Sequence, residues 1–247
     1  ALSLEGFKVG VLDADIHGPS MPKMFGVEEA RPVAVSTENG AEAIAPVEVY
    51  NGIKLLSIGF FVEPDKALIW RGSMASNALT QLLTESAWGD LDYLLIDMPP
   101  GTSDIHLTLV QTVALTGVVV VTTPQEVALI DARKGIDMFT TDKVEVPVLG
   151  LIENMSWFTP AELPTNRYYI FGKEGGKKLA QEMGVPLLAE LPLVQSICDS
   201  GDAGLPIASH SGSPLASYFK DLAIKLHTEV EKRNREIPPS HKVEVVH

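Results

Sequence analysis

Cysteine is almost absent from this chain of 247 residues, in which Cys198 is the only one. A single thiol excludes an internal disulfide framework and is typical of proteins in a reducing compartment. The chain also lacks any apolar run near the ~18 residues of a membrane-spanning helix. These two absences predict a cytoplasmic protein without a membrane partner.

Positively charged residues are few: 19 Lys and Arg stand against 32 Asp and Glu, which gives a formal net charge of −13. Such a charge repels phosphodiester backbones and anionic lipid unless a local basic patch intervenes. The cation pairs Lys177-Lys178 and Lys232-Arg233 are short and have acidic residues nearby. We therefore expect no nucleic-acid partner.

A phosphate-binding loop is also missing, because no G-x-x-x-x-G-K-[ST] sequence occurs anywhere in the chain. In nucleoside triphosphatases this loop supplies the backbone N–H groups and the lysine that neutralise the β- and γ-phosphates. The sequence begins at Ala1, and we expect the first strand and the phosphate loop of such a domain to precede it. On this interpretation the chain alone is inactive.

Short runs of apolar and β-branched residues alternate with longer segments of helical periodicity. This pattern is typical of a parallel sheet covered by helices on both faces. The predicted strands are Lys8–Leu12, Ile53–Ile58, Tyr93–Ile96, Val118–Thr122, Val148–Ile152 and Leu187–Leu191. The predicted helices are Ser73–Ser86, Thr108–Leu115, Leu129–Thr140, Gly175–Met183 and Ser213–Arg233. The sequence thus predicts one doubly wound, mostly parallel α/β domain over residues 1–236.

Three segments show no clear period. Glu28–Val49 is polar and rich in Ala, Glu and Pro, and we predict an irregular excursion between strands. Thr159–Arg167 contains two prolines, which indicates a long surface loop. The residues after 236 begin with Ile237-Pro238-Pro239, and we predict that 237–247 form a disordered tail.

Two carboxylates, Asp13 and Asp15, follow the first predicted strand. Side chains alternate across a strand, so both project the same way if the extended backbone continues. In open α/β sheets ligands bind beyond the carboxyl ends of the strands, where acids suit Mg²⁺ and an attacking water. The alternative interpretation is a pair of solvated turn residues.

A second acidic strand end follows Leu94-Leu95-Ile96, which lead directly into Asp97. This is the arrangement of a Walker B acid that holds magnesium. The turn Pro99-Pro100-Gly101 comes next, and its glycine is free to adopt unusual dihedral angles. We expect this turn to sense the γ-phosphate. An ordinary strand-to-helix turn, capped by Asp97 or Ser103, is the alternative.

Several motifs together resemble one known family. They are Gly6–Ser20, Trp70-Arg71-Gly72, Asp97–Thr102, Thr123–Ala128, Asp131–Gly135, Glu153–Ser156, Ile170-Phe171-Gly172 and Gly201–Pro206. With them the chain resembles, over nearly its whole length, the Mrp-type ATPases, iron-sulfur cluster carriers of the MinD or deviant Walker A class of P-loop NTPases. The resemblance implies an ATP-binding homodimer, with nucleotides in the interface and a cluster bridged between the subunits.

The resemblance also implies roles for individual residues. Asp97 would bind Mg²⁺, with Asp13 as a further candidate ligand, and Asp13 and Asp15 would be the catalytic switch carboxylates that orient water. Asn154 would contact the adenine, since its amide offers both a donor and an acceptor; a plain turn residue is the alternative. The segment around Pro192 would line the base pocket.

One feature of the family is missing from the loop Trp157–Ile170. The family pattern carries a Cys-x-x-Cys pair there. In this chain the corresponding positions lie near Pro160 and Leu163. Neither supplies a thiolate, so the usual four-cysteine site across a dimer cannot form from this loop. An iron-sulfur cluster is therefore implied by kinship alone, and Cys198 is more simply a small hydrophobe or an exposed thiol.

The leading hypothesis is an ATP-binding and ATP-hydrolysing iron-sulfur cluster carrier or assembly factor, which acts as a homodimer on iron-sulfur apo-proteins. A nucleotide-gated scaffold without cluster chemistry is one alternative, and the loop without cysteines favours it. A MinD-like positioning ATPase is another, although the net charge and the lack of a basic amphipathic tail argue against it.

Overall fold

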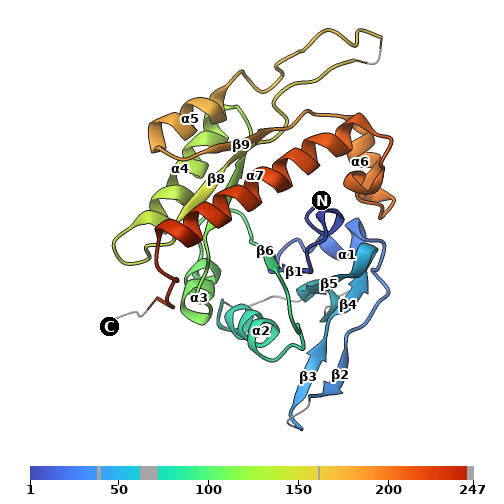
Figure 1. Cartoon of the computed structure of the whole chain (residues 1–247), viewed down its shortest axis with the longest axis vertical. Helices are drawn as coiled ribbons and strands as arrows, with labels where there is room; N and C mark the ends of the chain where they lie inside the picture. The colour runs from blue at the N-terminus through green and yellow to red at the C-terminus, as the bar shows by residue number, and fades with distance from the viewer. Residues whose placement is uncertain (38–39, 62–71, 161, 244–247) are drawn as a thin grey trace. The chain divides into compact units, whose positions relative to one another are not determined.

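The computed structural model describes residues 1–37, 40–61, 72–160 and 162–243. Trp70 and Arg71, two residues of the family-like motifs, lie outside these ranges. The chain divides into two units, of which the first comprises Ala1–Val113 with Asp199–His210 and the second Ala114–Cys198 with Ser211–His247. Each unit has its own sheet and helices (Figure 1).

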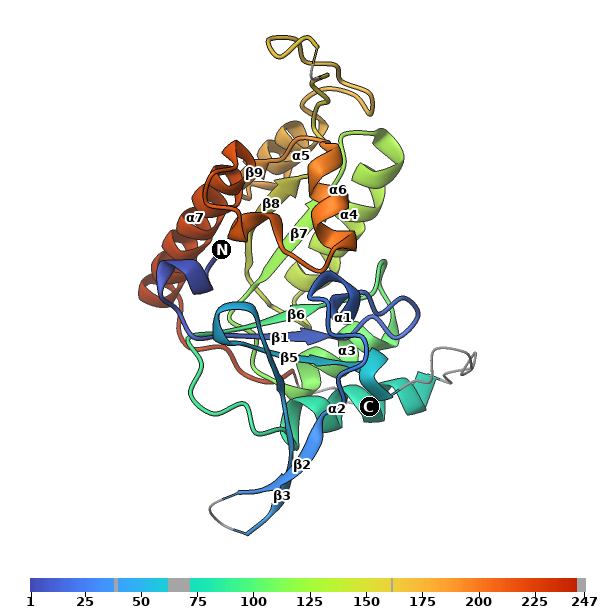
Figure 2. The ribbon, with the colours of Figure 1, turned by 90° about the vertical axis from the view of Figure 1, so that its right-hand side faces the viewer.

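The sheet of the first unit is built around strand β1 (Val9–Asp13), all five residues of which are buried. On one side β1 pairs in parallel with β5 (Ile53–Ser57) and on the other with β6 (Tyr93–Asp97). Strand β4 (Val47–Val49) adds an antiparallel edge to β5. Figure 2 shows β5, β1 and β6 side by side. Because these three strands run parallel, their carboxyl ends meet at one edge.

This unit also contains α-helices and a segment, residues 199–210, that comes much later in the chain. Helix α1 (Met21–Met24) follows the loop after β1, and α2 (Gly72–Thr84) and α3 (Asp104–Thr112) flank β6 in sequence. The segment 199–210 contains the end of α6 (Gln195–Asp202) and packs closely against the end of α1. A Cβ added to Gly204 would lie 2.5 Å from the Gly26 Cα atom, and Gly204 has a φ of +71°. Glycine is therefore required at this contact.

The second unit has a parallel sheet of β7 (Val118–Thr122), β8 (Val148–Glu153) and β9 (Leu187–Glu190), with β8 in the middle. Helices α4 (Glu126–Thr140) and α5 (Gly175–Met183) pack on Leu151, and α7 (Pro214–Glu236) packs on Ile152. Successive residues of a strand face opposite sides of the sheet. Helices therefore cover both faces of this sheet, as the doubly wound prediction requires.

The predicted mostly parallel α/β fold is confirmed, and the six predicted strands correspond to β1 and β5–β9. Helix α3 begins four residues earlier than predicted, because Ser103 caps it and donates its backbone N–H to His106 Nδ1 at 3.1 Å. Two short helices, α1 and α6, were not predicted. No helix in the described ranges is long and apolar enough to cross a membrane.

The prediction of an irregular Glu28–Val49 segment is wrong. Strands β2 (Val33–Ser36) and β3 (Glu42–Ala45) form an antiparallel hairpin there, and β4 follows. Most hairpin side chains are exposed or half-buried, so no buried face imposes an alternating pattern. Backbone bonds hold the hairpin instead: the Ile44 N–H donates to the Glu85 carbonyl, and the Ala87 N–H to the Ile44 carbonyl, both at 2.8 Å.

Hydrogen bonds fix parts of two other segments, the loop Thr159–Arg167 and the residues that follow α7. The loop Thr159–Arg167 is closed at its base by Phe158 and Tyr168, which exchange two backbone hydrogen bonds of 2.8 Å. At the end of α7, the buried Arg233 donates to the Pro238 carbonyl and to the Ser240 hydroxyl. These bonds connect the first residues of the predicted tail to the helix that precedes them.

Candidate functional site

Asp13 and Asp97 lie next to each other at the carboxyl edge of the first unit's sheet. The register of the parallel ladders pairs Asp13 with Ser57 on one side and with Asp97 on the other. Beyond the ladder, the Ala14 N–H donates to the Asp97 carbonyl at 2.8 Å. Two carboxylates 84 positions apart in sequence thus meet where α/β sheets bind ligands.

Asp13 is fully buried, and three groups donate hydrogen bonds to its carboxylate. The Ser57 hydroxyl donates to Oδ2 at 2.9 Å, the Met21 N–H to Oδ2 at 3.2 Å and the Asp15 N–H to Oδ1 at 3.2 Å. Burial nevertheless raises the pKa of Asp13, because desolvation outweighs these bonds. The side chain is held firmly in one orientation.

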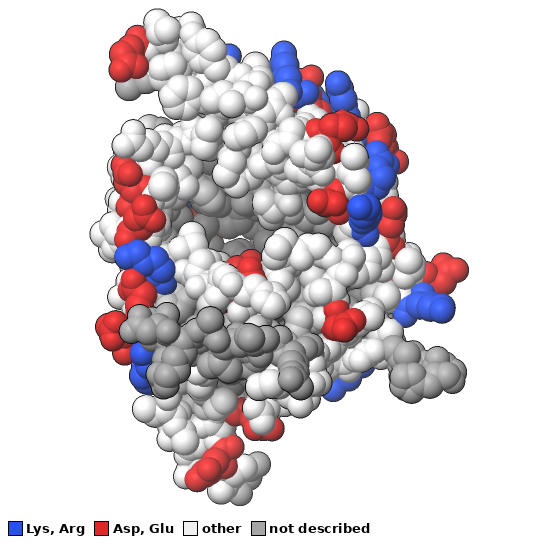
Figure 3. Space-filling model, turned by 180° about the vertical axis from the view of Figure 1, so that it is seen from behind, with Lys and Arg blue, Asp and Glu red and all other residues white. Residues whose placement is uncertain are grey.

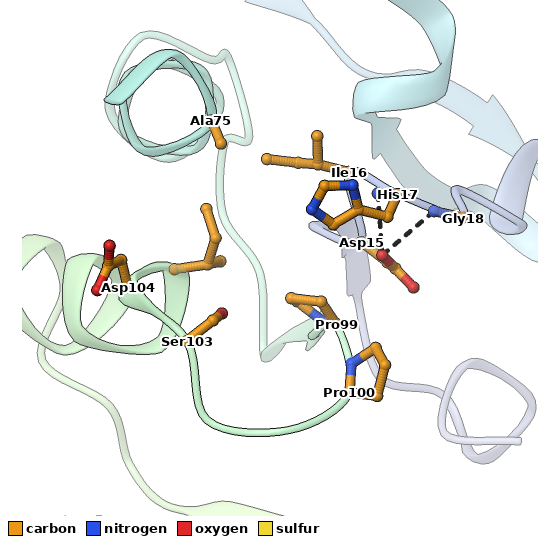
Figure 4. Close-up of a pocket in the computed structure, with 10 residues that line it drawn as sticks. Asp15, Ile16, His17, Gly18, Ala75, Pro99, Pro100, Ser103 and Asp104 are labelled. Atoms are coloured by element: carbon orange, nitrogen blue, oxygen red, sulfur yellow. Dashed lines mark hydrogen bonds between the residues drawn. The ribbon is translucent and has the colours of Figure 1, made fainter. Parts of the chain in front are cut away.

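Asp15 lies beyond the end of β1, so the alternation that we used to orient it does not apply. Its direction is set by a turn: Oδ1 accepts the backbone N–H groups of His17 at 3.1 Å and Gly18 at 3.2 Å (Figure 4). The residue is half-buried, and it lines a hollow at the edge of the sheet. Asp15 therefore faces the ligand side of the loop.

Asp97 differs from both, because no described residue donates a hydrogen bond to its carboxylate. Burial raises its pKa to about 6, with further contributions from the negative charges of Asp13 and Asp15. Among the described residues, no positive charge contributes to this shift. A cation at this carboxylate would relieve both the desolvation and the repulsion.

The residues fit magnesium better than a fully protein-bound metal. No group of three or more His, Cys, Asp or Glu side chains in the described ranges is arranged to hold a metal ion. Mg²⁺ typically takes one or two carboxylates and completes its shell with waters and substrate phosphates. Asp97 is the available carboxylate, and the buried Asp13 is less accessible.

A hollow with a volume of about 500 Å³ is lined by Asp15, whereas Asp13 and Asp97 are not among its lining residues. Its walls come from the loop after β1, the turn after β6, and helices α2 and α3 (Figure 4). The lining residues are Asp15, Ile16, His17, Gly18, Ala75, Pro99, Pro100, Ser103, Asp104 and Ile105. Gly101 follows the two prolines with a φ of +83°, a conformation that favours glycine, but it is not part of the lining.

The bond of Ser57 to Asp13 and the burial of His106 were missed by the sequence analysis. Ser57 is fully buried and bonded to Asp13, and its place at the end of a predicted strand was the only available signal. His106 is also buried, in the first turn of α3, and burial lowers its pKa. The predicted start of α3 at Thr108 left His106 outside the helix.

Asn154 and Pro192 belong to the second unit, where they follow β8 and β9. Backbone bonds of 2.8 Å join Leu191 to both sides of Asn154: the Leu191 N–H donates to Glu153, and the Ser156 N–H donates to Leu191. The Asn154 side-chain oxygen accepts the Met155 N–H at 3.0 Å, and Met155 has a φ of +55°. The structure therefore brings the two predicted base-contacting segments together.

Glu153 anchors this region from inside the second unit. It is buried, and its Oε2 accepts the N–H of Gly176 in the first turn of α5 at 2.5 Å. Its other oxygen, Oε1, has no partner among the described residues. A Cβ on Gly176 would lie 3.0 Å from both Cβ and Oε2 of Glu153, so the helix approaches the carboxylate closely because this residue is glycine.

Soft metal ligands are scarce. Cys198 is exposed, and it is the chain's only cysteine, so the chain has no internal disulfide. On the face shown in Figure 3, Lys and Arg are interspersed with Asp and Glu, and the described residues form no basic patch there.

Carboxylates gathered at the carboxyl ends of parallel strands, beside a hollow, are typical of the α/β nucleotide-binding proteins. The model of the ParA-type NUBPL iron-transfer P-loop NTPases matches residues 1–227, and the chain belongs to this family. Our sequence-based assignment to the Mrp-type carriers is thereby confirmed.

Individual relatives agree with this assignment. The chain is 47% identical, over 96% of its length, to the iron-sulfur cluster carrier protein of Salmonella typhimurium, and it spans 63% of that relative's length. A solved nucleotide-binding protein of Archaeoglobus fulgidus, in complex with ADP, is 34% identical with a TM-score of 0.68, over 82% of this chain and 76% of that one. The cell division ATPase MinD of Pyrococcus furiosus shares the fold at 20% identity, with a TM-score of 0.64 over 92% and 88%.

Proposed function

We propose that this chain supplies the magnesium and water side of an ATP-hydrolysing site in a homodimeric iron-sulfur cluster carrier. The observation that carries the proposal is the strand register that places Asp13 beside Asp97. Two acids in this position, one of which has its pKa raised to about 6 by burial and negative neighbours, form a site that attracts a cation.

In this site Asp97 is the magnesium-side acid. Asp97 would hold Mg²⁺, which when bound would supply positive charge for phosphoryl transfer. Asp15, held by two backbone N–H groups at the hollow, orients the attacking water. Asp13 supports this arrangement from within the sheet, and Gly101 allows the turn after β6 to approach the γ-phosphate.

The base would lie in the second unit, between the segments that follow β8 and β9. Asn154 would hydrogen-bond the adenine edge and Pro192 would pack against the ring. The short backbone bonds between these two segments support a common pocket, because they fix the spacing of Asn154 and Pro192.

Hydrolysis also needs preorganised donors for the transferring phosphoryl group. The 247 residues contain no lysine-bearing phosphate loop. We therefore propose that this chain alone binds nucleotide weakly and turns it over at the background rate, and that hydrolysis requires a phosphate loop to complete the site.

The cargo is an iron-sulfur cluster, passed to iron-sulfur apo-proteins in the cytoplasm. The curated relatives named as iron-sulfur cluster carriers support this cargo, and a chain with a single cysteine suits a reducing compartment. A homodimer would contribute two Cys198 thiols, fewer than the four of a common cluster site. Other ligands must therefore complete cluster binding.

A nucleotide-gated scaffold is the second candidate. In the loop where the family pattern carries cysteines, the Arg167 guanidinium lies 4.1 Å from the centre of the Trp157 ring. This cation–π contact stabilises the loop without a metal. On this alternative the dimer binds nucleotide and a partner protein but carries no cluster.

Anaerobic reconstitution separates the two candidates. The protein would be incubated with iron and sulfide, its dimer isolated, and its iron and sulfide content and visible spectrum measured. Stoichiometric cluster in the dimer supports the carrier. A colourless, iron-free dimer that still binds MgADP contradicts it and favours the scaffold.

A further inference from the structure

Ser57 lies beside Asp13 at the end of β5, and both residues are fully buried. The Ser57 hydroxyl donates to Asp13 Oδ2 at 2.9 Å and accepts the Gly59 N–H at 3.0 Å. A hydroxyl has only one proton to donate, and in this geometry Asp13 receives it. Ser57 is the only side chain in the described ranges that donates to this carboxylate.

Asp13 in turn holds both ends of the loop that follows it. The same carboxylate accepts the N–H of Asp15 near the start of the loop and that of Met21 at its end, each at 3.2 Å. The bond from Ser57 is the shortest of the three. Without it, a buried carboxylate would keep only two longer bonds, and the Gly59 N–H would lose its acceptor.

Gly59 makes a second contact with the same loop. A Cβ added to Gly59 would lie 3.1 Å from Cβ and 3.3 Å from Cγ of Pro19. The Ser57–Gly59 turn therefore touches the loop at Pro19 as well as through Asp13. Asp15 is carried on this loop and lines the hollow, so a shift of the loop moves its carboxylate.

We propose that Ser57 and Asp13 form a buried clasp that fixes residues 14–20 and so sets the position of the Asp15 carboxylate at the hollow. Ser57 is then a positioning residue of the site, and Asp13 acts through the loop. The effect on nucleotide rests on the proposed function, whereas the clasp itself is a property of the nucleotide-free chain.

Amide hydrogen exchange in the nucleotide-free protein tests the clasp. In Ser57→Ala, we expect the amides of Asp15 and Met21 to exchange about tenfold faster, as loss of a hydrogen bond to a charged group allows. The Ala14 amide, bonded to the Asp97 carbonyl, should keep its rate. Ser36→Ala, on the exposed face of β2, is the matched control and should change neither. Unchanged Asp15 and Met21 rates in folded Ser57→Ala would overturn the clasp.

Asp13→Asn tests the clasp by itself if Ser57→Ala folds poorly, and it completes a double-mutant cycle if that variant folds. Asp13→Asn preserves the side-chain volume, and it should accelerate the same two amides. The combination with Ser57→Ala should add nothing further, because Ser57 acts through Asp13. Independent, additive effects of the two substitutions would contradict the proposal.

Binding of a fluorescent MgADP analogue then measures the consequence for the site. Ser57→Ala should weaken binding by about the same factor as Asp13→Asn, and Ser57→Thr, which retains a hydroxyl, should restore it. If the Asp15 and Met21 amides of Ser57→Ala exchange faster but its MgADP affinity is unaltered, the clasp only stabilises the loop. That result would overturn its positioning role. Binding by the wild-type chain is expected to be weak but measurable; if it binds no MgADP analogue even at saturating concentration, the proposed function fails, and the exchange rates still decide the clasp.

Discussion

Asp97 lies directly across the parallel ladder from Asp13, with its own carboxylate free of hydrogen-bond donors from the described residues. Burial and the two neighbouring acids raise its pKa to about 6. A site that holds unneutralised negative charge in this way is less stable than a neutral one, unless a cation or a proton binds. The desolvation of Asp97 and its repulsion by Asp13 and Asp15 therefore favour the binding of a cation or a proton at this edge of the sheet.

Stability should depend on pH through Asp97. Its pKa is raised in the folded state, so the proton it binds stabilises the fold fully below the unfolded value near 3.8, and this contribution is lost as the pH rises through about 6. Asp97→Asn should remove that dependence and raise the free energy of unfolding at pH 7 by roughly 1–3 kcal/mol. Urea unfolding of both forms from pH 4 to pH 8 measures it. Equal stability of the two forms at pH 7 would refute the assignment.

Catalysis should depend on Asp97 once a phosphate loop is present. In a chimera with a strand, a G-x-x-x-x-G-K-[ST] loop and a helix placed before Ala1, Asp97→Ala should lower Mg²⁺-dependent ATP hydrolysis by about 100-fold or more. Cys198→Ala should leave the rate intact, because the Cys198 thiol is exposed and plays no part in the acidic site. Steady-state phosphate release reports both. Full turnover in Asp97→Ala would remove this residue from the mechanism.

Gly204→Ala should destabilise the protein by roughly 1–3 kcal/mol, because its Cβ would collide with Gly26 and its φ is positive. Gly135→Ala is a matched control, since it lies inside α4 with open space at its Cβ position. That substitution should be neutral or stabilising by up to ~1 kcal/mol. Thermal unfolding compares the two variants, and similar behaviour of both would show that the contact with Gly26 is not tight.

Glu153→Ala should cost roughly 1–3 kcal/mol, because the Gly176 N–H in the first turn of α5 would lose its buried acceptor. The exposed Glu231 on α7 provides the control, and Glu231→Ala should change stability by less than about 0.5 kcal/mol. Urea midpoints measure both. In Glu153→Ala, amide exchange should also increase at Gly176; a protected Gly176 amide would contradict the anchoring role.

Buried strands were predictable from the sequence because they have no polar face. The predicted strand Lys8–Leu12 corresponds to β1 (Val9–Asp13), all five residues of which are buried. The β2–β3 hairpin was not predictable in this way, since none of its strand side chains is fully buried and its strands are joined by backbone pairing. Apolar periodicity carries information only where one face is buried.

The acidic residues of the site were predictable, but their hydrogen bonds were not. Asp13 and Asp97 each follow an apolar strand, and parallel strands bring their ends together. Ser57 lacked any such signal, because a serine at a strand end is common and only the register with β1 gives it a partner. The direction of Asp15 depends on a turn to His17 and Gly18, which strand alternation could not describe.

Residues 199–210 belong to the first unit, although they are synthesised after most of the second unit. Protein synthesis proceeds from the N-terminus, and domains generally fold as their residues emerge from the ribosome. The contact between Gly26 and Gly204 cannot form until nearly 180 further residues have been added. The residues of the acidic edge are thus synthesised well before the segment that packs against Gly26 in the same unit.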